Sequence, residues 1–453
     1  MADTYLGPKS PCLYTFPFTF SPFSGASPRS LSFSLMASNC SSTTHQPSLL
    51  VFSGWNMALT KGTWSSLLNP CVHMSTTDGS KTQHLAENIT CGTAFNGVVE
   101  ELKKLTTRVA HVLPVSDDGG STAEIVRVLG GPAVGDIRSR CLRLSDQSTS
   151  EARAVRILLG HRLPLDSPRA KSEWYEIVEG SHELWQGVSK PYRETIRAFL
   201  AYFQDQILRR SDESFCFSNG SIGNFFFAGA RIFFQSLDAA IFLFSRVSDI
   251  PAESFVLPVI STNERLTLGC ELWDGTVIRG QNEISHPTHG SMQPIDKVFP
   301  TVNPTVLEQL RSVDCIVFGM GSLFTSICPS LVLLGVGEAI SLRSCPKVLL
   351  LNGTHDRETS GFSASCFVTA ITDALNRTYG DHHNCLTNPP NKYINTLLVP
   401  KNGLIPVDIE SLGSQGIFNV VTVDSIHDPK VGVLFDPKSL IQALSNLLTD
   451  EWA

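Results

Sequence analysis

The sequence has no run of basic residues. Lys and Arg total 35 against 42 Asp and Glu, and the formal net charge is −7. Because nucleic-acid surfaces need clustered Lys and Arg to neutralise phosphates, we expect no nucleic-acid partner. The chain also lacks an uninterrupted apolar stretch of about 20 residues, the length of a membrane span. Its most apolar segment, 222–245, contains Arg231, Gln235 and Asp238, so we expect core helices there and no membrane association.

Cysteine pairs with metal-ligand spacing are absent as well. The 12 cysteines are scattered from Cys12 to Cys385 without a C-x-x-C pair, which argues against structural zinc and favours buried, reduced thiols. Neither the G-x-S-x-G elbow of α/β-hydrolases nor the lysine motif of P-loop proteins occurs. Small molecules or other proteins are therefore the expected partners, and a homodimer is compatible with the sequence.

The first 47 residues have a composition of their own, dense in Ser, Pro and Phe. Asp3 is their only acidic residue, and Lys9 and Arg29 are their basic ones. This composition suits an organelle transit peptide, and it equally suits a plain disordered tail. The first interpretation predicts a chloroplast or another organelle as the location, and the second predicts the cytoplasm.

Residues 48–453 predict a single α/β domain. Five apolar runs read as buried strands: 48–53, 108–115, 314–318, 347–351 and 393–399. In the first half of the domain, amphipathic helices are predicted after such runs, at 98–105 and about 122–129. Strands that alternate with helices are typical of β-α-β units. The expected fold is a Rossmann-like, doubly wound, mostly parallel sheet.

Two excursions interrupt this sheet. Helices predicted at 151–159, 192–210, 222–234 and 238–245 form a helical insertion, and the polar segment 162–190 between them reads as a surface excursion. Two short strands around Asp274-Gly275, at 265–272 and 276–279, predict a small β-hairpin.

Residues 55–91 break the pattern between Gly54 and Gly92. They show no sustained period, and a structureless loop of this length in a strand-to-helix turn is improbable in a compact domain. Removing them would join Gly54 to Gly92-Thr93 and restore a short glycine turn. We hypothesise that this irregular insertion is a retained intron or gene-model artefact, which impairs activity if it is translated.

Four glycine-bearing loops follow predicted strands. In an open parallel sheet, ligands bind where the strands end, and glycine turns before helices expose backbone N–H groups that favour anions such as phosphates. A single glycine after a strand is more often only a turn, so the inference rests on all four together. The candidate ligand-binding residues in and beside these loops are Gly54, Gly92, Thr93, Asn96, Gly119, Gly120, Ser121, Gly319, Gly321, Ser322, Asn352 and Thr354.

Asp117 and Asp118 are the most informative pair. Two adjacent carboxylates between an apolar strand and a Gly-Gly-Ser turn are costly unless they are solvated, bind a metal or hold a polar ligand. Capping of the next helix explains at most one of them. Mg²⁺ needs only one or two carboxylates besides phosphate oxygens, so we predict Mg²⁺ as cofactor, with this pair as its ligands and as the catalytic residues.

Three further residues have two interpretations each. Asp136 and Arg138 belong to the motif Gly-Asp-Ile-Arg. In one interpretation Asp136 makes a polar contact to the ligand and Arg138 clamps a phosphate; in the other Asp136 caps the helix and Arg138 is solvated. Asn224 faces the ligand or caps the apolar helix that follows it. The stretch 319–327 offers amide and hydroxyl donors to an anion. His355 and Glu358 lie three residues apart, a spacing that suits metal ligation on a helix, but their segment reads as a loop, for which a polar rim is the alternative.

The ordered set of motifs resembles one family. Ser-Gly54 joined to Gly92-Thr93 is similar to its Gly-Gly-Thr loop, Ser-Asp-Asp-Gly-Gly-Ser at 116–121 to its acidic loop, and Gly135–Arg138 to its next motif. Later blocks are similar at 223–225, 274–284, 319–326 and from 352 onward. From about residue 48 to the C-terminus, the insertion excepted, the chain is identified as a eukaryotic member of the CofD-type 2-phospho-L-lactate transferases and their YvcK-like relatives.

The resemblance implies one of two functions. CofD-type members are Mg²⁺-dependent and transfer a phospholactyl or phosphoenolpyruvyl-type group from a guanosine diphosphate-linked donor to the deazaflavin Fo. YvcK-like members bind nucleotide sugars and act as regulators without a known reaction, and the sequence Asp-Asp-Gly-Gly-Ser is closer to theirs. The resemblance thus leaves open whether the chain is an enzyme.

Overall fold

The computed structural model describes residues 46–53, 95–116, 120–210, 214–271, 277–279, 300–356, 358–377, 385–429 and 431–450. Gln46–Ala453 form one compact unit, to which all elements described below belong.

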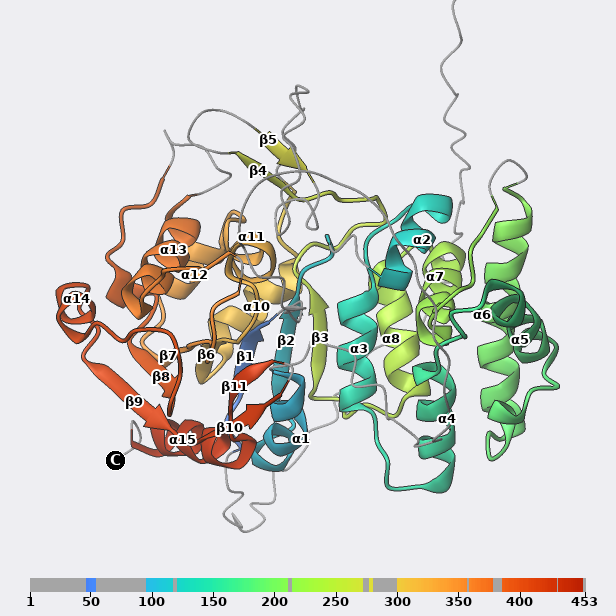
Figure 1. Cartoon of the computed structure of the whole chain (residues 1–453), viewed down its shortest axis with the longest axis horizontal. Coiled ribbons are helices and arrows are strands. Elements are labelled where there is room, and N and C mark those ends of the chain that lie inside the picture. The colour runs from blue at the N-terminus through green and yellow to red at the C-terminus, as the bar shows by residue number, and fades with distance from the viewer. Residues whose placement is uncertain are drawn as a thin grey trace, which may run out of the picture. The chain divides into compact units, whose positions relative to one another are not determined.

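A seven-stranded parallel sheet runs through this unit (Figure 1). Its order is β3-β2-β1-β6-β7-β8-β9, and all neighbouring strands pair in parallel. The strands are β1 (Leu49–Phe52), β2 (Val109–Leu113), β3 (Phe255–Pro258), β6 (Cys315–Phe318), β7 (Lys347–Leu350), β8 (Thr396–Pro400) and β9 (Asn419–Val423). The direction of winding reverses between β1 and β6, which makes the sheet doubly wound. The predicted Rossmann-like fold is confirmed.

Helices cover both faces of the sheet, which is why its central strands are almost wholly apolar. On one face, Val51 and its neighbours pack against α1 (Asn96–Leu105), α3 (Gly135–Leu144) and α15 (Pro437–Asp450). On the other, Phe52 and its neighbours pack against α10 (Pro304–Ser312), α12 (Val336–Ser341) and α13 (Ala364–Asn376).

The predicted helical insertion between β2 and β3 is also confirmed, and it lies beside the β3 edge of the sheet (Figure 1). Besides α3 it contains α2 (Gly120–Leu129), α4 (Ser150–Gly160), α5 (Ser167–Glu179), α6 (Lys190–Leu208), α7 (Ile222–Phe234) and α8 (Leu237–Val247).

The expectation of a surface excursion at 162–190 was wrong. This segment forms α5 and a 3₁₀ turn, η1 (Glu183–Trp185), and it buries Trp174 and Trp185. Asp166 caps α5, and Gly180 ends it in a left-handed conformation with φ 86°. Apolar residues spaced to lie on one helix face drive this packing, although charged residues surround them in the sequence.

Two antiparallel hairpins complete the unit. The predicted hairpin is present as β4 (Gly269–Glu271) and β5 (Val277–Arg279), and a second forms from β10 (Ser425–Asp428) and β11 (Gly432–Phe435). The remaining elements are the π-helical turn η2 (Leu323–Ile327), α11 (Cys328–Leu331), the 3₁₀ turn η4 (Pro390–Lys392) and α14 (Ile409–Ser414). Among the described helices, none is long and apolar enough to cross a membrane.

Candidate functional site

The ends of β1 and β6 meet at the switch point of the sheet. The Gly319 amide, directly after β6, donates a 2.7 Å hydrogen bond to the carbonyl of Phe52. A Cβ at Gly319 would lie 2.8 Å from that oxygen, so the close approach of the two strand ends requires a glycine. In open α/β sheets the crevice at such a switch point is where ligands bind.

Three helices begin next to one another beside this edge. The amide Nδ2 of Asn224, in the first turn of α7, lies 3.0 Å from Ser121 Oγ and 3.4 Å from Thr122 Oγ1 at the start of α2. A Cβ at Gly135, where α3 begins, would lie 2.8 Å from the same Thr122 oxygen. Helix N-termini carry partial positive charge, so three of them together favour an anion.

Arg138 brings a full positive charge to the same place. Its Nε donates a 3.1 Å hydrogen bond to Asn224 Oδ1, and the side chain is buried. Burial, and then repulsion from Arg162, lowers the pKa of Arg138 to about 9, while Asp136 opposes the shift. The guanidinium therefore stays charged at neutral pH. Arg162 approaches as well, with Nη1 3.5 Å from Ser121 Oγ.

Arg140 extends from the same helix toward the end of β1. Its Nη2 donates to Ser53 Oγ across 3.2 Å, and its guanidinium lies over the ring of Phe95, 5.1 Å from the ring centre. Neither Arg140 nor Ser53 was predicted as a site residue, because their contact joins residues 87 positions apart.

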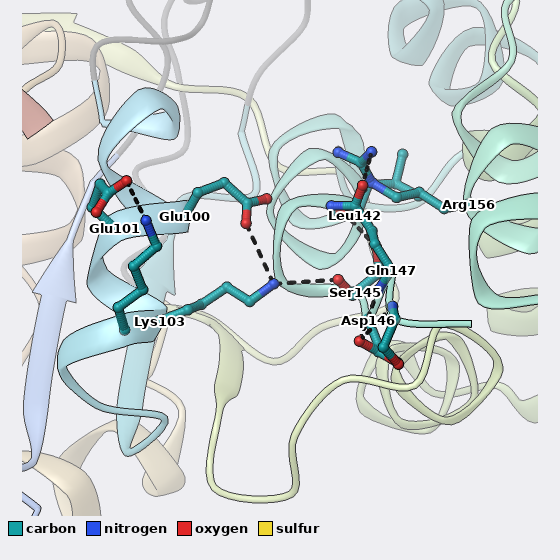
Figure 2. Close-up of polar contacts among 10 residues, drawn as sticks. Glu100, Glu101, Lys103, Leu142, Ser145, Asp146, Gln147 and Arg156 are labelled. Atoms are coloured by element: carbon teal, nitrogen blue, oxygen red, sulfur yellow. Dashed lines mark hydrogen bonds and ion pairs between the residues drawn. The ribbon is translucent and has the colours of Figure 1, made fainter. Parts of the chain in front are cut away.

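The opposite end of α3 is held by cations (Figure 2). Lys103 Nζ, which also pairs with Glu100, donates to the carbonyl of Ser145 at 3.3 Å, and Arg156 Nε donates to the carbonyl of Leu142 at 3.1 Å. Cations near the last carbonyls of a helix are favourable for hydrogen bonding and for the helix dipole. These contacts fix the helix whose first turns carry Arg138 and Arg140.

A match to a known family accompanies this geometry. The family model described as 2-phospho-L-lactate transferase CofD matches residues 88–429. The chain belongs to the CofD family.

Similar proteins span several organisms. An uncharacterised protein of Saccharomyces cerevisiae is 32% identical over 406 residues, covering 70% of this chain and 90% of that protein. A gluconeogenesis factor of Halalkalibacterium halodurans is 28% identical over 288 residues, covering 62% of this chain and 71% of that protein. The crystal structure of a Bacillus halodurans protein is 20% identical with a TM-score of 0.58, over 88% of this chain and 100% of that one. At that identity the likeness concerns the fold alone.

In this CofD-family chain the loops after β6 and β7 are joined to each other. Asn352 Oδ1 accepts from the Gly321 amide at 3.3 Å, and its Nδ2 donates to the Gly321 carbonyl at 3.0 Å. Thr354 Oγ1 donates to the carbonyl of Val431 at 3.2 Å, next to β11. Ser322 is buried beside Gly321. These four predicted residues therefore lie in the two loops that follow β6 and β7, at the carboxyl edge of the sheet.

Glu358 accepts hydrogen bonds from donors in the stretch 319–327 that we expected to bind an anion. Its carboxylate accepts from the amides of Phe324 and Thr325, at 2.8 and 3.2 Å, and from Thr325 Oγ1 at 2.6 Å. These donors at the start of η2 are thus used within the chain. The polar loop expected around His355 includes this internal contact.

Several predicted residues fall outside the described part of this CofD-family chain: Gly54, Gly92, Thr93, Asp117, Asp118 and Gly119. Asn96 and Gly120 are described only as the first residues of α1 and α2. Within the described ranges, no group of three or more His, Cys, Asp or Glu side chains could hold a metal. The acidic pair and its Mg²⁺ stay predictions.

Proposed function

We propose that this chain binds a nucleotide-linked, phosphorylated ligand at the carboxyl edge of its sheet and acts as a CofD-type transferase. The observation that carries the proposal is the buried Arg138 guanidinium among the N-termini of α2, α3 and α7. A desolvated cation beside three positive helix ends is a binding site for phosphate oxygens. The family membership supports the same class of ligand.

The proposed reaction is a group transfer at phosphorus. A hydroxyl oxygen of deazaflavin Fo attacks the β-phosphorus of a guanosine diphosphate-linked donor, forming one P–O bond. The P–O bond to the α-phosphate breaks and GMP leaves, while the hydroxyl proton passes to a base, for which Asp118 with Asp117 is our candidate. In such transfers the protein mainly positions the reactants and stabilises charge.

The residues of this chain have distinct parts in that scheme. Arg138, held by Asn224, would orient and neutralise phosphate oxygens, and the first turns of α2 and α3 would add backbone donors. Asp117 and Asp118 would hold Mg²⁺ together with phosphate oxygens, a donor set adequate for this ion. When bound, Mg²⁺ would neutralise charge on the diphosphate.

A second candidate function is binding of a nucleotide sugar without catalysis. The observation in its favour is that several similar bacterial proteins are named gluconeogenesis factors rather than transferases. The acidic sequence Asp-Asp-Gly-Gly-Ser also favours this branch. Both candidates share the phosphate site, and only the transferase requires an acceptor.

A ligand panel tests the proposal. Purified chain is heated with Fo, guanosine nucleotides or UDP-sugars, each with and without Mg²⁺, and GMP release from a guanosine diphosphate-linked donor with Fo is measured by chromatography. A ligand at 100 times its Kd adds about 2.7 kcal/mol, a rise in Tm of several degrees. GMP release supports the transferase, and stabilisation by UDP-sugars alone supports the regulator.

A matched pair of variants tests whether the ligand-induced rise in Tm depends on Arg138. Arg138→Met should abolish the ligand-induced rise in Tm. Arg197→Met removes an arginine of α6 that bonds the carbonyls of Val178 and Glu179, away from the sheet edge, and should leave the rise unchanged. If no phosphorylated ligand raises the Tm of the unsubstituted chain, the proposed function is wrong.

A further inference from the structure

Arg140 is a buried cation at the switch point of the sheet. It is 4% exposed, and its Nη2 bonds Ser53 Oγ just after β1. Ser53 and Phe95 both also border Gly319, after β6: a Cβ at Gly319 would lie 3.2 Å from Ser53 Cβ and 3.4 Å from the Phe95 ring. The guanidinium thus lies where the ends of β1 and β6 meet the start of α1, the place at which this class of fold binds phosphates.

Polar atoms in this place have no partner within the described part of the chain. They are Nε and Nη1 of Arg140 and both ring nitrogens of His111, which is 0% exposed on β2. The His111 ring packs edge-on against Phe95, with ring centres 6.4 Å apart. Most buried polar atoms in proteins have a partner, and an orphaned one costs stability, so such a group needs an explanation.

Among the described residues, the charges around Arg138 and Arg140 leave a surplus of positive charge. Asp136 interacts favourably with both Arg138 and Arg140, whereas Arg143 repels both. Within the described part of the chain, one carboxylate thus serves two buried guanidiniums. Side chains two positions apart on a helix point about 200° apart, and accordingly Arg138 meets Asn224 on α7 while Arg140 meets Ser53 after β1. The two cations belong to two different places on either side of α3.

We propose that Arg140, aimed by Ser53, binds a second oxyanion group of the ligand, separate from the group bound by Arg138 and Asn224. This rests on the proposed function and deepens it: Arg140 is assigned to the anionic group of the ligand that Arg138 does not bind, such as a carboxylate separated from a diphosphate. A desolvated guanidinium with two nitrogens to offer binds an oxyanion more strongly than an exposed one.

The test uses inorganic phosphate, which needs no nucleotide. The Nε–H signals of ¹⁵N-arginine-labelled full-length chain are assigned to Arg138 and Arg140 from substituted variants, and phosphate is titrated in. Saturable shifts of both signals are expected. In Arg140→Met the Arg138 signal should still respond to phosphate. The affinity of this variant for the guanosine diphosphate-linked donor should fall at least about 10-fold, the effect of one charge-assisted hydrogen bond.

Control variants separate binding from a structural role. Arg193, on α6, also has a buried Nε without a partner in the described chain and lies over a ring, that of Trp185, at 5.5 Å. Arg193→Met should lower the Tm and leave phosphate binding unchanged, whereas Arg140→Met should leave the Tm unchanged or raise it. If Arg140→Met does not fold, Ser53→Ala gives the milder test, with a weakened phosphate response of Arg140.

The outcomes distinguish failure of the two-anion inference from failure of the proposed function. An Arg140 signal that does not respond to phosphate, or a lower Tm in Arg140→Met with unchanged donor affinity, overturns the inference. Saturable phosphate binding at both arginines without any nucleotide response overturns the proposed function and leaves the two-anion site standing.

Discussion

The hydrogen bond from Arg138 Nε to Asn224 Oδ1, 3.1 Å long, joins the first turn of α3 to the first turn of α7. The same Asn224 side chain donates to Ser121 on α2, so one amide connects three helix N-termini. Each partner fixes the other: the amide oxygen holds the guanidinium, and the amide nitrogen holds the hydroxyl. The charge of this junction can therefore be changed by a single near-isosteric substitution.

Asn224→Asp should weaken ligand binding more than Asn224→Ala does. The new carboxylate keeps a bond to Arg138 but cancels its charge, repels phosphate and loses the donors to Ser121 and Thr122. We expect a loss of about 10-fold or more in affinity, the effect of a changed charge-assisted contact. Calorimetric titration with the ligand found in the panel measures it.

Asn376→Asp is the matched control for this substitution. Asn376 also bridges with both ends of its amide, to the hydroxyl of Tyr393 and the carbonyl of Asn388, but on α13. Its replacement should lower the Tm without changing ligand affinity. Equal losses of affinity in both variants would show that Asn224 acts only through stability.

Gly223→Ala should lower both stability and ligand affinity. Its Cβ would lie 2.5 Å from the carbonyl of Leu159 and 3.0 Å from Cγ and Cδ of Arg138, so the helix contact must open and the guanidinium must move. Alanine normally stabilises a helix interior over glycine by about 0.5–1 kcal/mol, and here the clash outweighs that gain.

Gly229→Ala, on the same helix, separates the two effects. Its Cβ would lie 2.2 Å from the carbonyl of Phe199 on α6, a comparable backbone clash, and the atoms nearest to it belong to Phe199 and Phe203. We expect a lower Tm for both variants in thermal unfolding, and reduced ligand affinity only for Gly223→Ala. A loss of affinity in Gly229→Ala of the same size would refute the role given to the Arg138 contact.

The sequence predicted the sheet well because its strands are short, apolar and bounded by glycine loops. All the strands expected in the parallel sheet are present within a few residues of their predicted bounds. It failed for α5, where Ala170, Trp174 and Ile177 are buried although charged residues separate them. The spacing of these three was a helix signal, and the high polarity of the segment concealed it.

Of the candidate site, only the residues that belong to local sequence motifs were predicted. Glycine loops and Arg138 stand out in the sequence because each belongs to a short motif after a strand or before a helix. The contacts of Arg140 with Ser53 and of Glu358 with Thr325 join residues 87 and 33 positions apart, so no local pattern indicates them. Both depend on the order of strands in the sheet, which brings distant loops to one edge.

Stability should fall as the pH drops from about 6.5 toward 5, through His111. Burial, and then the charge of Arg140, lowers the pKa of His111 well below its usual value, so the folded chain keeps this ring neutral. The unfolded chain binds a proton near pH 6.5, and the folded chain does not. Below that pH the unfolded state therefore holds more protons, and the free energy of unfolding decreases by up to about 1.4 kcal/mol per pH unit.

Urea unfolding of the chain and of His111→Leu, at several pH values between 5 and 8, measures this effect. The difference in the free energy of unfolding between the two should grow as the pH falls, because the variant has no ring to protonate. His427, on β10, is exposed, and His427→Leu should leave the pH dependence of the original chain unchanged. A constant difference between His111→Leu and the original chain would contradict the prediction.

Deletion of residues 55–91 should leave the sheet intact and raise ligand affinity. Ser53 and Phe95 are the nearest described residues on either side of the segment. Both contact Arg140 and both border Gly319, so a short loop suffices to join them. The deletion leaves Gly54, Gly92, Thr93 and Ala94 between them, and four residues reach about 13 Å. The match to the family model begins only at residue 88, near the end of this segment.

Loop entropy gives the expected magnitude. Shortening the connection from 41 residues to four lowers the entropy cost of closing it by about 2 kcal/mol, so the Tm should rise. A variant that replaces 55–91 with a Gly/Ser segment of equal length keeps the loop long and should gain neither Tm nor affinity. We expect the restored Ser-Gly-Gly-Thr turn to offer backbone donors next to Ser53 and Phe95, which both contact Arg140. Affinity should then rise for phosphorylated ligands and stay the same in the Gly/Ser variant. A deletion variant that folds but binds no better would show that residues 55–91 do not obstruct the first glycine loop.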